Sequence, residues 1–161
     1  MNSPIKELIN PLPGYTILHV TSKADEMSSV LSRMLKEVGG TLNLAIYEPT
    51  EEIEEFDENV KVQYLDGYEK IFRALPRDND IVIFKEVLAS HFDKERMLKN
   101  AYMTLANAAQ IIIMEKKGVM DISEVKSWLF EREFRAANEI DIIEGYDLIM
   151  AKKMHMWGNG L

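Results

Sequence analysis

Short apolar runs alternate along this chain with segments whose apolar residues recur at helical spacing. Residues 15–20 form the first run, and residues 27–38 repeat methionine, valine and leucine every three or four positions. That period predicts a helix with one buried face, and Gly39 and Gly40 end it, because glycine adopts the left-handed cap conformation without a Cβ penalty. Residues 42–47 form a second run. Strand, helix and strand of these lengths predict a right-handed parallel crossover.

The same pattern continues through the middle of the chain. Further strands are predicted at residues 60–65, 80–84 and 110–114. Helical spacing predicts a short solvated helix at 50–58, a short helix at 68–75 that Pro76 ends, a helix after Asp93 that reaches Ala108, and another at 121–133. Strands that alternate with helices predict an α/β fold around a mainly parallel sheet.

The end of the chain breaks this alternation. Two apolar runs, 138–143 and 146–154, are separated only by Glu144 and Gly145. So short a connection permits antiparallel pairing alone, so the pattern predicts a hairpin.

Length and composition predict one domain. A chain of 161 residues is long enough to bury a hydrophobic core without disulfides or bound metals. We expect an arm at 1–14, a single α/β domain at 15–154 and a tail at 155–161. Turn-forming prolines punctuate the arm, with one helical turn expected around residues 5–9. The absence of cysteine excludes disulfides and thiolate chemistry, and no segment reads as a signal peptide or membrane span. We therefore expect a soluble, cytoplasmic protein.

The charge of the chain bears on its partners. The formal net charge is −8 and the pI is near 5.0. Sequence-independent binding of nucleic acid requires a basic surface, so this class of partner is disfavoured.

The first crossover carries the candidate ligand chemistry. In mononucleotide-binding folds the elbow after the first strand receives the ligand, and an acid that closes the second strand binds a ribose. Glu48 has that position, but the elbow at 21–26 contains no glycine. Ser22 and the amino terminus of the helix are its natural donors to a ligand, while Ser22 and Asp25 would alternatively form a capping box.

Five strands alternating with helices, then a helix and an antiparallel hairpin, resemble the S-adenosylmethionine-dependent methyltransferases of the Rossmann-like class I. The resemblance covers residues 15–154 and lies in topology more than in motifs, since the family's first-strand acid and its glycine-rich loop are missing. It implies a three-layer fold with a seven-stranded, mostly parallel sheet and a C-terminal antiparallel hairpin strand. It also implies S-adenosylmethionine as the cofactor.

The resemblance further implies roles for single residues. Glu48 matches the acid that binds the ribose hydroxyls, and Asp66 matches an acid that contacts the adenine amino group. The loop after the fourth strand of the family faces the methyl acceptor, which makes Lys85, Glu86 and His91 candidates for catalysis.

Each candidate also has a structural interpretation. Glu48 is equally typical of an acid that merely ends a strand, and Asp66 beside Gly67 is equally typical of a turn. His19, inside a strand, is expected to be a hydrogen-bonded core histidine, and His91, in a loop, is expected to lie at the surface unless it serves as a general base. With His155 in the tail, the histidines are too scattered to predict a metal site.

Two functional hypotheses follow. In the first, the protein is an active methyltransferase that positions an unknown acceptor against the cofactor. In the second, it keeps the fold as a non-catalytic binding or interaction module with a protein partner, because side chains at 21–24 fill the space of the cofactor's methionine moiety. The sequence identifies neither the acceptor nor the partner, and it leaves the oligomeric state open.

Overall fold

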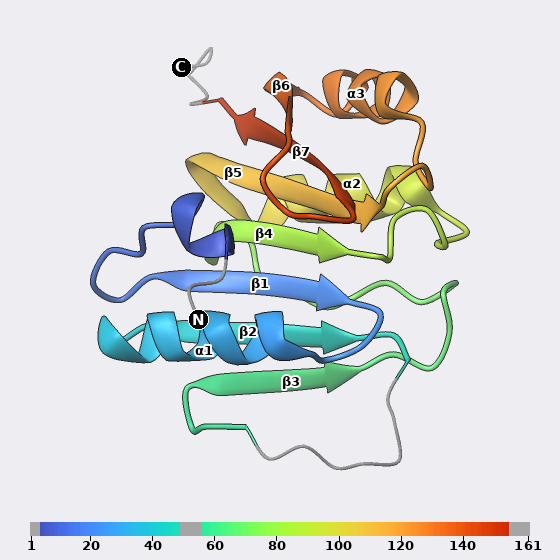
Figure 1. The fold of residues 1–161 in the computed structure, drawn as a ribbon. Helices are drawn as coiled ribbons and strands as arrows, with labels where there is room; N and C mark the ends of the chain where they lie inside the picture. The colour runs from blue at the N-terminus through green and yellow to red at the C-terminus, as the bar shows by residue number, and fades with distance from the viewer. Residues whose placement is uncertain (1–3, 49–55, 155–161) are drawn as a thin grey trace.

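The computed structural model describes residues 4–48 and 56–154, which form one seven-stranded sheet in the order β3-β2-β1-β4-β5-β7-β6. Its first five strands are parallel, and β7 lies antiparallel between β5 and β6 (Figure 1). The strands are β1 Thr16–Thr21, β2 Thr41–Ile46, β3 Val60–Tyr64, β4 Asn79–Lys85, β5 Leu105–Lys116, β6 Phe134–Ile140 and β7 Tyr146–Lys153. The predicted fold class is confirmed.

Helices cover both faces of this sheet. The 3-10 helix η1 (Pro4–Glu7) and α1 (Glu26–Glu37) pack on one face, whereas α2 (Lys94–Thr104) and α3 (Ile122–Glu131) pack on the other. Successive residues of β1 supply the two cores: Ile17 faces α1, and Leu18 faces the side of α2 and α3. The buried strands between two helical layers give the three-layer architecture.

The predicted β1–α1–β2 crossover is present, with each boundary shifted by one residue. Gly39 has φ +68° and ends α1 in the left-handed conformation. Gly40 is needed for a different reason, because a Cβ there would lie 2.3 Å from the backbone oxygen of Tyr15. The close approach of that oxygen brings the start of β1 against the end of α1.

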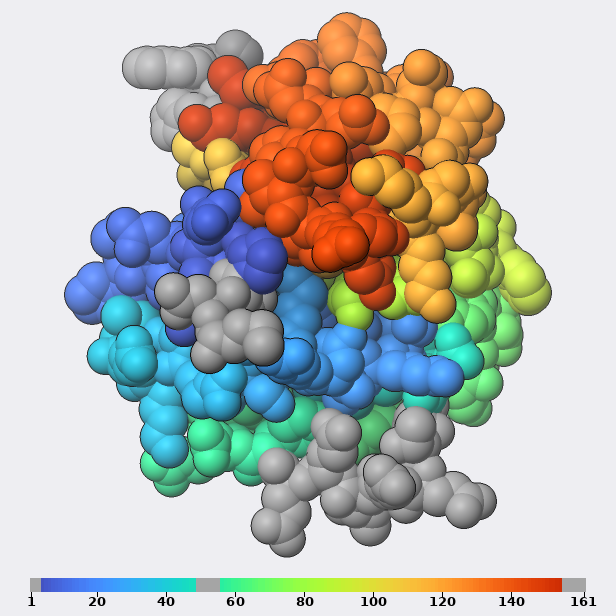
Figure 2. All heavy atoms as spheres, viewed as in Figure 1, coloured from blue at the N-terminus to red at the C-terminus, as the bar shows by residue number. Residues whose placement is uncertain are grey.

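The N-terminal arm contributes to the core. Ile5 and Ile9 are fully or almost fully buried in the cluster that α1 covers, together with partly buried Ile140 and Ile143 from the end of β6 and the connection to β7. In Figure 2 the arm lies between α1 and that connection. The expected helical turn is the short helix η1, Pro4–Glu7.

One helix prediction is wrong, and a second is confirmed except at its end: α2 begins after its N-cap Asp93 as predicted but stops early. Residues 68–75 form turns and irregular backbone, because the segment bonds to the neighbouring strand: Gln63 accepts from the backbone N–H of Arg73 at 2.8 Å and donates to its carbonyl at 2.8 Å. Helix α2 ends at Thr104, four residues before Ala108, because Leu105 pairs with Asn79 in the sheet. The acidic segment at 50–58 lies largely outside the described residues.

The hairpin is present but its boundaries differ. β6 begins at Phe134, four residues before the predicted start, because this side chain is almost completely buried. Residues 141–145 form the connection, in which Gly145 has φ +83°. The register is irregular between Arg135 and Asn138, where Ala136 has φ +56°. A bulge interrupts the alternation of buried and exposed residues, so the start of β6 could not be predicted from that alternation.

Candidate functional site

The elbow after β1 is fastened to both neighbouring strands. The backbone N–H of Ser22 donates to the carbonyl of Lys85 at 3.2 Å, and its carbonyl accepts from Glu48 at 2.7 Å. The Thr21 hydroxyl donates to the carbonyl of Lys23 at 2.8 Å. No residue from 21 to 26 has a positive φ. The backbone of this elbow therefore turns into α1 without the conformations that require glycine.

Asp25 is the N-cap of α1. Its carboxylate accepts from the backbone N–H of Met27 at 3.0 Å, while its own N–H donates to the Ser28 hydroxyl at 3.3 Å. This is a capping box, which satisfies donors that the first turn of a helix leaves without partners. The alternative box of Ser22 with Asp25 is wrong, since Ser28 is the partner. Ser22 remains a predicted ligand donor.

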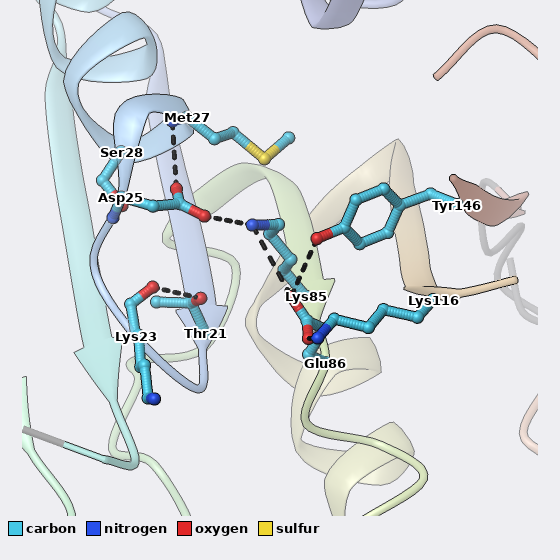
Figure 3. Close-up of polar contacts among 9 residues, drawn as sticks. All are labelled: Thr21, Lys23, Asp25, Met27, Ser28, Lys85, Glu86, Lys116 and Tyr146. Atoms are coloured by element: carbon cyan, nitrogen blue, oxygen red, sulfur yellow. Dashed lines mark hydrogen bonds and ion pairs between the residues drawn. The ribbon is translucent and has the colours of Figure 1, made fainter. Parts of the chain in front are cut away.

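The same carboxylate forms an ion pair with Lys85, the last residue of β4 (Figure 3). The Lys85 side chain is 10% exposed. Burial by itself lowers the pKa of Lys85, but the hydrogen bond and the charge of Asp25 outweigh it and raise that pKa overall. The elbow is thus held to β4 by its backbone at Ser22 and by a side chain at Asp25.

Glu86, one of the catalytic candidates, follows this lysine in a strained conformation. Its φ of +58° is uncommon for a residue with a side chain. The carboxylate accepts from the Tyr146 hydroxyl at 3.0 Å and lies 3.6 Å from the Lys116 ammonium (Figure 3). Lys85, 3.7 Å away, completes a charged cluster at the carboxyl ends of β4 and β5. Strained backbone persists where surrounding contacts determine it, and it is frequent at ligand sites.

Glu48 lies beside two stacked aromatic rings. The hydroxyl of Tyr68 donates to the Glu48 carboxylate at 2.6 Å. The ring of Tyr68 lies parallel to that of Tyr47, with centroids 5.0 Å apart, and the Tyr47 hydroxyl donates to the Lys70 carbonyl at 2.6 Å. One oxygen of Glu48 is therefore engaged within the chain.

Three carboxylates act on the hydroxyl of Tyr68. Burial raises the pKa of this phenol, and Glu48, Glu115 and Glu86 raise it further through their charges. These acids come from the ends of β2, β5 and β4, so negative charge converges on the carboxyl edge of the sheet. Glu86 is paired with Lys85 and Lys116, whereas Glu48 and Glu115 form no ion pair within the described residues, so the region around Tyr68 keeps an excess of negative charge that favours a cation over an anion.

The catalytic candidate His91 is buried, not at the surface as expected. Its Nδ1 accepts from the backbone N–H of Asp93 at 2.8 Å, so its Nε2 carries the proton and donates to the Lys70 carbonyl at 2.8 Å. Both ring nitrogens are thus committed to the backbone. This arrangement orders the start of α2, and it leaves no lone pair for a general base.

His19 is a core histidine, as predicted, but it is not hydrogen-bonded. It is fully buried, and among the described residues neither of its ring nitrogens has a partner. Burial lowers its pKa to about 4, with a further lowering by Lys85 and an opposing effect of Asp25. His19 is therefore neutral at physiological pH.

The remaining predictions concern Asp66 and metals. Asp66 is exposed just after β3, beside Gly67. Among residues 4–48 and 56–154, no group of three or more potential ligands could hold a metal ion. No helix within those ranges is long and apolar enough to cross a membrane.

Sequence reasoning named Asp25, Lys85 and Glu86 but missed the contacts that join them, and it missed Tyr146 and Glu115 as residues of this edge. Asp25 and Lys85 meet across 60 positions, and Tyr146 reaches Glu86 from the last strand. Their partners are set by strand order, for which the sequence gives no local signal. Glu115 did have a signal, because it ends an apolar strand just as Glu48 does.

Comparison with solved structures identifies the fold. The chain is similar to a SAM-dependent methyltransferase from Aquifex aeolicus, with a TM-score of 0.73, 16% identity, and coverage of 94% of this chain and 89% of the other. The chain is also similar to one from the complex between the Haloferax volcanii Trm112 methyltransferase activator and a methyltransferase. Here the TM-score is 0.70 and the identity 10%, with coverage of 89% of this chain and 84% of the other. A third similar structure is the Haemonchus contortus phosphoethanolamine N-methyltransferase 2 in complex with S-adenosyl-L-methionine. Its TM-score is 0.70 and its identity 9%, with coverage of 94% of this chain and 51% of the other.

Comparison at the level of sequence adds no relative. No family model and no curated protein matches this chain. The protein therefore has the fold of the class I methyltransferases, and at such identities the similarity shows the fold alone.

Proposed function

We propose that this protein binds S-adenosylmethionine at the carboxyl edge of β1 and β2 and acts as a methyltransferase. The observation that carries the proposal is the position of Glu48, which lies two residues after β2 in the class I fold and whose backbone N–H donates to the carbonyl of Ser22 in the elbow. A ribose diol is a ligand suited to such an acid. The acids that converge on Tyr68 further favour a cation, and the cofactor carries its methyl group on a positive sulfonium.

The residues of the edge fit the parts of this cofactor. Glu48 and Asp66 would hold the nucleoside. Ser22 and the elbow would hold the amino-acid end, because among the described residues the backbone N–H groups of Lys23 and Ala24 have no hydrogen-bond acceptor. Bound cofactor supplies an electrophilic methyl group. Lys85 and Glu86 border the expected approach of the acceptor, where their contribution is orientation and charge.

Two contacts favour a second candidate function, a non-catalytic binding module that has lost the cofactor. Asp25 and Lys85 neutralise each other across the edge, and Tyr68 occupies one oxygen of Glu48. Groups that would bind a ligand are thus partly satisfied by the chain itself. Its ligand would be a protein, as in the Haloferax volcanii complex of methyltransferase and activator. Nucleic acid is disfavoured by the net charge of −8.

Calorimetric titration with S-adenosylmethionine and S-adenosylhomocysteine tests the proposal. We expect micromolar binding that Glu48→Gln weakens by about tenfold or more, because the neutral amide accepts ribose hydroxyls less strongly. The matched control is Glu37→Gln at the far end of α1, which should leave the affinity unchanged. Absence of heat with folded wild-type protein would overturn the proposal and favour the non-catalytic module.

A second variant tests whether the Tyr68 hydroxyl competes with the cofactor for Glu48. Tyr68→Phe removes the hydroxyl that donates to Glu48 and keeps the ring stacked on Tyr47. If the cofactor uses this carboxylate, its affinity should rise several-fold in the variant, by roughly the worth of one competing hydrogen bond. An unchanged affinity would mean that the Tyr68 hydroxyl does not compete with the cofactor for Glu48.

A further inference from the structure

A cavity of about 140 Å³ lies beside the edge, on the face of the sheet that α2 and α3 cover. It is distinct from the elbow, since none of residues 21–26 lines it. Its wall comes from the loop after β4, the end of β5, the connection from β5 to α3, the first turn of α2 and one side of α3. The lining residues used below are Leu88, Lys94, Glu115, Asp121, Glu124, Val125 and Trp128.

The size of this cavity limits its ligand. An engineered apolar cavity of about 150 Å³ in another protein holds one benzene molecule. The present cavity therefore accepts a group of about six heavy atoms. Apolar walls from Leu88, Val125 and the ring of Trp128 suit a hydrocarbon body.

The charges around the cavity select the polar end of the ligand. Glu115 is 3% exposed, and it accepts from the backbone N–H of Ala89 at 3.1 Å. Lys94 is the only cation of the lining, and its ammonium donates to the His91 carbonyl at 2.8 Å. Glu124 and Asp121 add two further carboxyl groups. The lining thus holds three carboxyl groups and one ammonium, so negative charge is in excess. Asp121 and Glu124 are exposed, which leaves Glu115 as the buried carboxylate of the cavity.

Glu115 is the buried carboxylate whose charge a cationic ligand would stabilise. Burial raises its pKa, and the charge of Glu86 raises it further, whereas the backbone N–H groups of Ala89 and Leu88 and the charge of Lys94 lower it. The pKa stays raised overall, so these contacts do not fully offset the loss of water, and a cation brought to the carboxylate would stabilise it further. Trp128 also lines the cavity, and its indole is the kind of aromatic side chain that attracts organic cations.

We infer that this cavity binds a small organic ammonium ion, with its charged end at Glu115 and its hydrocarbon body against Val125 and Trp128. The inference goes beyond the proposed function, because it assigns a ligand class to a second site and does not depend on the cofactor. An anion of the same size is disfavoured by Glu115 and Glu124, and a neutral molecule forgoes the charge interaction.

Nuclear magnetic resonance provides the test. Cyclopentylammonium has six heavy atoms, and cyclopentanol is its neutral isostere. Each is titrated into the full chain without S-adenosylmethionine, while the indole N–H signal of Trp128 is followed after assignment with Trp128→Phe. The ammonium ion should shift this signal saturably with a Kd on the order of 1 mM, and the alcohol should bind about tenfold more weakly or less.

Two glutamate variants identify the charge that matters. Glu115→Gln keeps an acceptor for the Ala89 N–H and should weaken binding of the ammonium ion by about tenfold. Glu131→Gln, on the same helix as Trp128 but outside the cavity lining, should leave the Kd unchanged. Equal binding of alcohol and ammonium, an unaffected Glu115→Gln variant with a native spectrum, or no saturable shift would each overturn the inference. Because no cofactor is present, failure here is distinguishable from failure of the proposed function.

Discussion

At the scale of single residues, His19 is a costly polar group of this core. Its two ring nitrogens are buried without partners among the described residues, whereas buried polar groups are normally hydrogen-bonded. An unsatisfied buried group costs about 1–3 kcal/mol of stability. Its neighbours on the adjoining strands are Leu44 and Ile83, which offer no acceptor.

The depressed pKa of His19 predicts a dependence of stability on pH. Below pH 6.5 the unfolded chain binds a proton at this residue that the folded chain, with a pKa of about 4, does not. Stability from His19 is therefore complete above pH 6.5 and decreases as the pH falls toward 4. Between pH 7 and pH 5 this loss should be about 2 kcal/mol.

Urea unfolding of His19→Leu at the two pH values measures that loss. The variant should be at least as stable as the wild type at pH 7, and its decrease at pH 5 should be smaller by about 2 kcal/mol. Equal decreases in both proteins would show that His19 already has an internal partner for its proton.

At the scale of elements, the elbow and β4 are coupled through Asp25 and Lys85. Asp25→Asn should cost about 2 kcal/mol, because it keeps an acceptor for Met27 but leaves the buried Lys85 ammonium with only the Glu86 carboxylate, 3.7 Å away, as a counter-charge. Lys85→Met should cost less, since an apolar chain fills the same space. Urea unfolding of the single and double variants gives the coupling energy.

The combined effect decides this prediction. We expect the double variant to be about as stable as Lys85→Met alone. In the absence of Lys85, the change Asp25→Asn leaves no buried ammonium without its partner. Strict additivity of the two single changes would mean that the ion pair contributes nothing. The 35% exposure of the Asp25 side chain sets an upper limit on the coupling, since solvent screens it.

The end of α1 gives a second prediction at this scale. Gly40→Ala should destabilise the fold by about 1–3 kcal/mol, because the new Cβ meets the backbone oxygen of Tyr15, which cannot move aside alone. Gly39→Ala is the matched control: nothing lies within 4 Å of its Cβ, so its cost is only the φ of +68°, about 1 kcal/mol. Thermal unfolding ranks the two, and an equal effect would argue against close contact at Gly40.

At the scale of the whole molecule, the N-terminal arm belongs to the core beneath η1 and α1. Ile5→Ala should cost about 2–4 kcal/mol, because the side chain is fully buried between elements that lie far apart in sequence. Leu12→Ala, in the same arm but with 63% exposure, should change stability by less than about 0.5 kcal/mol. Similar small effects at both positions, measured by urea unfolding, would mean that the arm detaches in solution.

Residue patterns predicted much of the fold because their cause is local. The 3.6-residue period of α1 and the apolar run of β1 express burial of one face or two, which any packing of these segments preserves. The same logic failed where tertiary pairing prevailed: residues 105–108 continue a helical pattern but belong to β5, whose first residue, Leu105, pairs with Asn79 of β4. It also failed at 68–75, where Gln63 takes the backbone bonds that a helix would have made internally.

The sequence by itself determined the alternation of strands and helices, the antiparallel end and the position of Glu48 at the close of a strand, because each depends on neighbours in the chain. Only the tertiary structure decided which side chains meet. The pairing of Asp25 with Lys85, the engagement of Glu48 by Tyr68 and the burial of Glu115 depend on strand order and on loops that no period describes. Periodicity records how deeply a residue is buried, whereas its partners are selected by the packing of the whole sheet.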